Sequence, residues 1–96
     1  MKFDWDPDKN KINKIKHNVS FEEAETVFED ENAIYLFDEH HSKDEDRFLV
    51  IGEDDTFREL AVCHCYRGLH DEIIRIISAR KATTIEIKLY ERGLYS

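Results

Sequence analysis

Hydrophobic and polar side chains follow one another along the chain with spacings that predict a succession of short elements. Residues 2–5 alternate polar and aromatic side chains, which is typical of a strand. Asp6 followed by proline is a helix N-terminal signal, so a first helix is expected over residues 7–17. Ile12 and Ile15 are spaced for one face of this helix, which otherwise carries many lysines.

A second helix is predicted over residues 21–29. Ser20 is followed three residues later by Glu23, which is the capping-box pattern at a helix start. The apolar residues that follow recur at helical spacing and are Phe21, Ala24, Val27 and Phe28.

The second half of the chain is dominated by strand patterns. Residues 33–37, 47–51, 59–66 and 72–79 are runs of apolar and β-branched residues, and an acidic loop covers residues 38–46. The last three runs are joined by short connections, which predicts an antiparallel meander.

A final helix is predicted over residues 81–92, with Ile85 and Leu89 four residues apart and Gly93 as its stop signal. The order of elements indicates an α+β fold with two N-terminal helices and a C-terminal helix packed on a mainly antiparallel sheet of four to five strands. With 96 residues, the chain is expected to form one domain over residues 1–96.

Composition and charge narrow the classes of function. No apolar run is long enough for a signal peptide or a membrane span, so a cytoplasmic protein without a membrane partner is expected. The net charge of -8 argues against a general nucleic-acid coat protein. Residues 1–60 contain 8 Lys and Arg against 18 Asp and Glu, whereas residues 61–96 contain 6 against 4. Cationic chemistry is therefore expected near the C-terminus or from the lysines at positions 9, 11, 14 and 16.

Two cysteines flank a histidine, which invites a metal-site interpretation. In a strand, Cys63 and Cys65 lie on one face roughly 6 to 7 Å apart, which is poor geometry for a disulfide. Alternation sends His64 to the opposite face, so the three side chains cannot chelate one ion. His40 and His41 form a weak metal-like cluster with nearby acids, for which adventitious binding is the simpler explanation. We therefore expect reduced thiols, no metal site and no cofactor.

Four segments carry a family resemblance that covers nearly the whole chain. Residues 3–11 (FDWDPDKNK), 16–28 (KHNVSFEEAETVF), 46–48 (DRF) and 75–82 (RIISARKA) together resemble the BrnT family of toxins. Asn18 stands where that pattern usually has Gly, and both residues tolerate a left-handed backbone.

The resemblance implies a RelE-like fold and a ribonuclease toxin of a type II toxin-antitoxin pair, acting in bacterial stress response. Its partners would be an RNA substrate and a BrnA-like antitoxin of the ribbon-helix-helix type, which would inhibit the toxin and alone contact operator DNA. Cleavage would proceed by attack of the ribose 2'-hydroxyl on the neighbouring phosphate without a metal ion. Such a site needs a proton acceptor, a proton donor and cations facing the phosphorane.

Arg75, Arg80 and Lys81 are the strongest candidates for catalytic cations. The two arginines bracket residues 76–79 of the last predicted strand, and Lys81 follows at the junction with the final helix. The alternative is that Arg75 pairs with an acid such as Glu72 or Asp46 while the other two are solvated. For the cluster as a whole we favour a phosphate site.

His64 and Arg47 are further catalytic candidates. His64 alternates onto the face of Leu60, Val62 and Tyr66, where a hydrogen-bonded core residue is the commoner role and an acid or base the rarer one. Arg47 opens a strand after the acidic loop and could line the same site, although a salt bridge to Asp44, Glu45 or Asp46 is the favoured interpretation. Tyr90, Ser78 and Arg67 are candidate RNA-binding residues, with packing as the alternative for the tyrosine.

An interaction module without enzymatic activity is the alternative function. Residues 83–86 (TTIE) stand where the family often has arginines, and the first two thirds of the chain are acidic. Such a protein would bind the antitoxin and act as a corepressor on operator DNA.

Overall fold

The computed structural model describes residues 1–95, and residue burial as far as position 93. The elements follow one another in the order β1 (Lys2–Asp4), α1 (Pro7–His17), α2 (Phe21–Glu25), η1 (Thr26–Glu29), β2 (Ile34–Phe37), η2 (Glu39–His41), β3 (Phe48–Glu53), β4 (Glu59–Arg67), β5 (Ile73–Lys81) and α3 (Thr84–Tyr95). None of the helices in these residues is long and apolar enough to cross a membrane.

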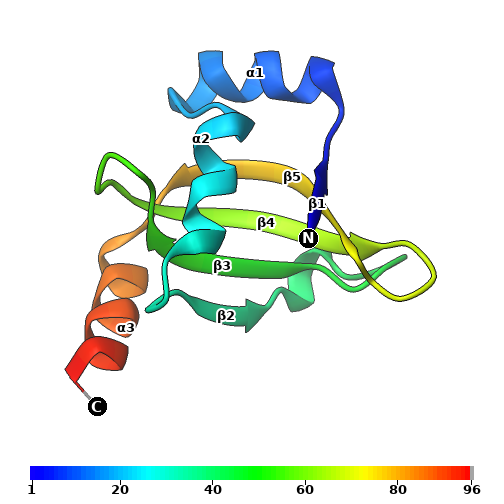
Figure 1. Cartoon of the computed structure of the whole chain (residues 1–96). Helices are drawn as coiled ribbons and strands as arrows, with labels where there is room; N and C mark the ends of the chain where they lie inside the picture. The colour runs from blue at the N-terminus through cyan, green and yellow to red at the C-terminus, as the bar shows by residue number, and fades with distance from the viewer. Residues whose placement is uncertain (96) are drawn as a thin grey trace.

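The strands form a sheet in the order β1-β5-β4-β3-β2. All neighbouring strands are antiparallel except β1 and β5, which are parallel. In Figure 1, α2 crosses the sheet, α1 lies beyond β5, and α3 lies near the end of the sheet where β5 finishes. This arrangement confirms the predicted α+β class with helices on a mainly antiparallel sheet.

Helix α1 is anchored by polar side chains and not by its two isoleucines. Ile15 is 88% exposed and Ile12 is 60% exposed, whereas Asn10 and Asn13 are buried. Asn10 accepts a hydrogen bond from the backbone N–H of Phe21, and it donates one to the Glu22 carboxylate. The helix therefore docks through side-chain amides, which an apolar pattern cannot reveal.

The connection from α1 to α2 follows the predicted local signals. Asn18 ends α1 in the left-handed conformation, with φ of 56°. The capping box between Ser20 and Glu23 is formed in both directions. The second helix is shorter than expected, because the α-helix ends at Glu25 and the 3₁₀ turn η1 completes it.

The end of β5 and both ends of α3 differ from the predicted boundaries. Strand β5 continues through Arg80 and Lys81, which the sequence pattern had placed at or beyond its end. Helix α3 therefore begins later, and it continues past Gly93 to Tyr95 rather than stopping at the glycine. A single Gly is tolerated inside a helix at a cost of about 1 kcal/mol.

The two faces of the sheet are packed against different helices. The face toward α1, α2 and η1, here called the closed face, contains the main core, including Val50, Val62 and Ile76. On the other face, here called the open face, a smaller cluster of Ile51, Ala61 and Tyr90 packs where α3 covers one end. The rest of the open face is available for a functional site.

Candidate functional site

A cleft of about 320 Å³ lies on the open face of the sheet. Its polar wall is formed by Asp38, His40, His41, Arg47, Ser78 and Arg80. Leu49, Cys63 and Ile77 supply apolar surface beside them. The cleft therefore combines residues of β3, β4 and β5 with the loop that connects β2 to β3, and we call it the open-face cleft.

Arg80 is held in a fixed direction by the first turn of α3. Its Nη1 and Nη2 donate to the two oxygens of Glu86, at 2.7 and 3.0 Å. Glu86 also accepts from the backbone N–H of Thr83 at 2.9 Å, so the carboxylate is itself fixed. The hydrogen bond with Glu86 raises the pKa of Arg80, and the same bond lowers the pKa of Glu86. The guanidinium is thus permanently charged and preoriented.

Arg47 supplies a second guanidinium to the cleft from the residue before β3. Its Nη2 lies 3.7 Å from Glu45 Oε1, which is a loose ion pair. Its Nε is buried without a hydrogen-bond partner. The pairing with Glu45 confirms the predicted salt bridge, although the contact leaves much of the guanidinium's donor capacity unused.

His41 and Asp38 form a carboxylate–imidazole pair at the rim of the cleft. His41 Nδ1 lies 2.9 Å from Asp38 Oδ2, and the side chains are 65% and 11% exposed, respectively. The short helix η2 creates this contact by bringing residues three apart in sequence onto one side. Since Nδ1 is committed to the carboxylate, Nε2 is the ring nitrogen available to a substrate. The arrangement suits proton transfer.

Cys63 lies beside this pair as a neutral thiol. Burial raises the pKa of Cys63, and the charge of Asp38 raises it further. Both cysteines are free, as the spacing predicted. A protonated, buried thiol is a poor nucleophile, so Cys63 contributes surface to the cleft rather than chemistry.

The three predicted cations do not form one cluster. Arg75 Nη1 donates to Asp4 Oδ2 at 2.6 Å near the start of β5, so it is paired with β1 and lies outside the cleft. Lys81 is opposite Leu60 in the ladder and therefore extends toward the closed face. Among them only Arg80 lines the cleft. Alternation separates Lys81 from Arg80, and roughly 17 Å of strand separates Arg75 from Arg80.

A β-bulge decides which side chains of β5 reach the open face. The register jumps from Cys63 opposite Ser78 to His64 opposite Ile76, which leaves Ile77 as the extra residue. Without this extra residue, Arg75 and Arg80 would point to opposite faces because they are five positions apart. The bulge also brings Ser78, a predicted RNA-binding residue, to the border of the cleft.

His64 lies in the core of the closed face and not at the cleft. It has no exposed surface, and its imidazole is surrounded by the rings of Phe28, Tyr35, Phe48 and Tyr66. Nδ1 is hydrogen-bonded to the Val62 carbonyl at 3.1 Å, and burial lowers the pKa of His64. The predicted alternation onto the closed face is confirmed, and this position corrects the expectation that the ring could border a catalytic site.

Two predicted RNA-binding residues also lie away from the cleft. Tyr90 is 3% exposed, and its hydroxyl donates to Asp30 Oδ2 at 2.6 Å. A ring in this position fixes α3 to the sheet and is not free to stack on a base. Arg67 lies at the end of β4, where Nη2 is 3.1 Å from Glu45.

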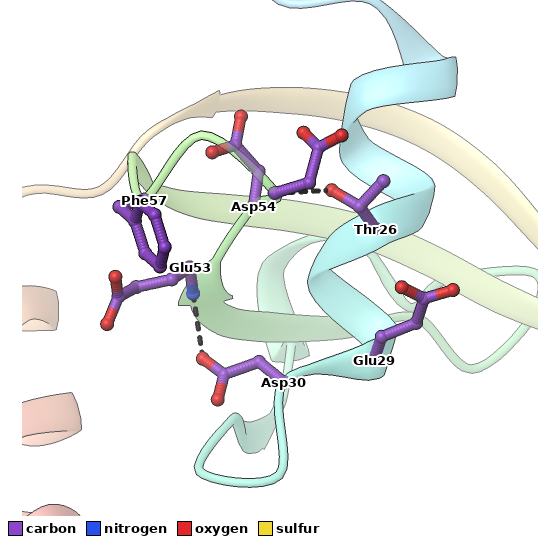
Figure 2. A pocket seen from close by; sticks show the side chains of 7 residues that line it. Thr26, Glu29, Asp30, Glu53, Asp54 and Phe57 are labelled. Carbon is purple, nitrogen blue, oxygen red and sulfur yellow. Dashed lines mark hydrogen bonds between the residues drawn. The ribbon is translucent and has the colours of Figure 1, made fainter.

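A second pocket, of about 240 Å³, is strongly acidic. Figure 2 shows the carboxylates of Glu29, Asp30, Glu53 and Asp54 around it, with the exposed ring of Phe57 at one side. Negative charge of this density repels a phosphate chain. The acidic pocket is therefore unsuited to RNA.

The imidazole side of the cleft was not assigned to the site from the sequence. His40, His41 and Asp38 were interpreted as a loop cluster without a designed role. The available signal was the spacing of Asp38 and His41, which one turn of 3₁₀-helix brings together. Within the described residues, no group of three His, Cys, Asp or Glu side chains is arranged to hold a metal ion.

Comparisons with known proteins bear on the family and the fold. The family model described as "Ribonuclease toxin, BrnT, of type II toxin-antitoxin system" matches residues 5–86. The crystal structure of the Brucella abortus ribonuclease toxin BrnT is similar, with a TM-score of 0.65 and 28% sequence identity. That match covers 88% of this chain and 99% of the Brucella chain. A search of curated proteins found no match.

Proposed function

Because the chain belongs to the BrnT family of ribonuclease toxins from type II toxin-antitoxin systems, we propose that it cleaves RNA without a metal ion at the open-face cleft. The observation that carries the proposal is the meeting of Arg80, Arg47 and the His41–Asp38 pair in one cavity. These are the groups that a transesterification at phosphorus requires.

In this mechanism the ribose 2'-oxygen forms a bond to the adjacent phosphorus, and the bond from phosphorus to the 5'-oxygen breaks. His41 accepts the 2'-hydroxyl proton through Nε2, while Asp38 fixes the ring and stabilises its positive charge. His40, the other imidazole of the cleft, is assigned as the donor of a proton to the leaving 5'-oxygen. The two guanidiniums stabilise the extra negative charge of the phosphorane.

Arg80 is the principal phosphate ligand in this proposal. Glu86 holds its guanidinium rigidly from one side, which reduces the reorganisation needed when negative charge develops. Arg47, with its loose ion pair and unpartnered Nε, is free to turn toward the phosphate. Ser78 borders the same cavity and is assigned a contact with the RNA backbone.

Inhibition is assigned to a BrnA-like antitoxin of the ribbon-helix-helix type that covers the cleft. Membership of a type II toxin family implies an antitoxin partner. The acidic pocket formed by Glu29, Asp30, Glu53 and Asp54 offers a charge-complementary contact for a basic segment of that partner. Contact with operator DNA is assigned to the antitoxin, since the toxin has a net charge of -8.

Cleavage of a single-stranded RNA in the presence of EDTA tests the proposal. The wild-type protein should cleave and leave 2',3'-cyclic phosphate ends. Arg80→Ala should lower the rate by about 10²–10³-fold, as expected for loss of a charge-stabilising donor. Arg75→Ala is the matched control, because it removes an arginine from the same strand and face but outside the cleft. A metal requirement, or equal losses in both variants, would contradict the assignment.

A further inference from the structure

A second, cationic groove of about 170 Å³ runs between α1 and the outer edge of β5. It is lined from the helix by Lys9, Ile12, Asn13, Lys16 and His17. These positions are separated by three or four residues and therefore share one face of α1. Ile77 and Ser78 of β5 form its other wall. We call it the α1 groove.

The α1 groove and the open-face cleft share a wall. Ile77 and Ser78 line both cavities, so the bulged segment of β5 is the ridge between them. The described pairing of β1 with β5 ends at Arg75, so β5 has no neighbouring strand beyond it at the ridge. A chain molecule can thus pass from one cavity to the other over this edge.

The charge of the α1 groove contrasts with the rest of the molecule. The chain has 22 acidic residues, yet no carboxylate is among the residues that line the groove. Lys9 and Lys16 take part in none of the salt bridges found in the described part of the chain. Their ammonium groups are therefore available to an external anion.

Helix stability explains only part of this pattern. Lys16 and His17 lie in the last turn of α1, where positive charge offsets the helix dipole. Lys9 lies in the first turn, where the dipole disfavours a cation. A lysine at this position is better explained by an anionic ligand.

We propose that the α1 groove is a phosphate-binding subsite for the single-stranded RNA that flanks the cleavage position. This inference rests on the proposed function, because it assigns the same RNA chain to both cavities. Lys9 and Lys16 each neutralise one phosphate, while Ile12 and Ile77 give apolar contact to a ribose or base.

The test measures binding of a fluorescein-labelled single-stranded oligoribonucleotide whose 2'-hydroxyls are all methylated, so that it cannot be cleaved. The double variant Lys9→Gln with Lys16→Gln is compared with Lys11→Gln with Lys14→Gln. Both pairs remove two charges from the same helix, but only the first pair lines the groove. Anisotropy titrations over a range of salt concentrations give the affinity and its salt dependence.

The groove variant should bind several-fold more weakly at low salt, and its slope of log affinity against log salt should be shallower by about 1.4. The Lys11 and Lys14 variant should retain the wild-type slope. In cleavage assays the groove variant should raise KM for a long RNA, and it should leave a dinucleotide substrate unaffected, because that substrate fills only the cleft.

Equal slopes for the two double variants would overturn the subsite. Unchanged RNA binding together with weaker binding of the antitoxin would also overturn it, and would assign the groove to a protein partner. Failure of the proposed function is recognised separately, by a metal requirement or by equal cleavage rates of the Arg80→Ala and Arg75→Ala proteins. Neither result depends on the lysine pairs.

Discussion

The closed and open faces of the sheet are built from alternate residues of the same strands, yet they have different physical roles. On β4, Val62 and His64 face the helices and have no exposed surface, while Cys63 between them borders the open-face cleft. One strand thus supplies the core and the site at successive positions. Position on a strand, and not residue type, decides which role a side chain takes.

Two histidines illustrate this contrast. His64 is confined by four aromatic rings, and burial lowers the pKa of its imidazole, so it is neutral at physiological pH. His41 is on a loop, 65% exposed and bonded to a carboxylate. The buried ring contributes to packing, whereas the exposed ring has the partner and the access that proton transfer requires.

The largest expected effect comes from placing a charge on the closed face. Val62→Asp buries a carboxylate without a partner and should lower the free energy of unfolding by at least about 4 kcal/mol. Cys63→Ser, one residue away on the open face, should lower it by less than about 1 kcal/mol. Urea unfolding of the two variants measures the difference, and similar losses would show that the faces are not distinct.

A smaller effect, on catalysis, is expected at the open face. His41→Ala removes the assigned proton acceptor and should reduce RNA cleavage by about 10²-fold. His70→Ala is the matched control, because His70 lies in the turn between β4 and β5 and outside the cleft. RNA cleavage rates of the two variants, measured over a range of pH values, test this prediction. An unaltered cleavage rate in His41→Ala would contradict the mechanism.

The smallest effect is a pH dependence of stability that arises from His64. The folded-state pKa is below the ordinary value of 6.5, so the unfolded chain binds the proton first as the pH falls. The stability contributed by the neutral ring is therefore complete above about pH 6.5 and decreases below it, by up to about 1.4 kcal/mol per pH unit. Thermal unfolding of wild type and His64→Leu between about pH 7.5 and 5 measures this loss.

Titration of buried carboxylates does not overlap with the pH range in which the effect of His64 on stability is measured. Burial would raise the pKa of Asp54, but hydrogen bonds from Arg58 and Thr56 hold it below the ordinary value of 3.8. The stability that these hydrogen bonds give to the folded protein is present above pH 3.8 and is lost only at lower pH. An acid-induced loss in His64→Leu equal to that of the wild type above pH 5 would therefore refute the role of His64.

Local signals in the sequence predicted most of the fold. The capping box at Ser20, the left-handed Asn18 and the alternation of β4 depend on neighbouring residues, and each is present in the structure. The docking of α1 is not predictable from the apolar pattern, because its contacts are made by amides to residues as distant as Ala79. Long-range hydrogen bonding leaves no periodic signal.

The site was less predictable than the fold for a related reason. Arg80 is identified from its position at the end of a strand, but its predicted grouping with Arg75 and Lys81 is wrong. Arg75 lies roughly 17 Å away along β5 and pairs with Asp4, and strand alternation sends Lys81 to the closed face. His41 lines the same cleft as Arg80 only because of the path that the loop after β2 takes. Contacts between a loop and a sheet face depend on tertiary structure, which spacing alone does not encode.

Asn13 affects whether another polypeptide can add a strand to the edge of the sheet at β5. Its side-chain amide donates to the Ala79 carbonyl at 2.8 Å and accepts from the Ala79 N–H at 3.1 Å, as a neighbouring strand would. The backbone of β5 is thereby occupied at the point where another polypeptide could otherwise add itself and extend the sheet. The edge of the sheet that lies opposite, β2, has no such side-chain substitute among the hydrogen bonds described for its residues, so the two margins of the sheet differ in how open they are to strand addition.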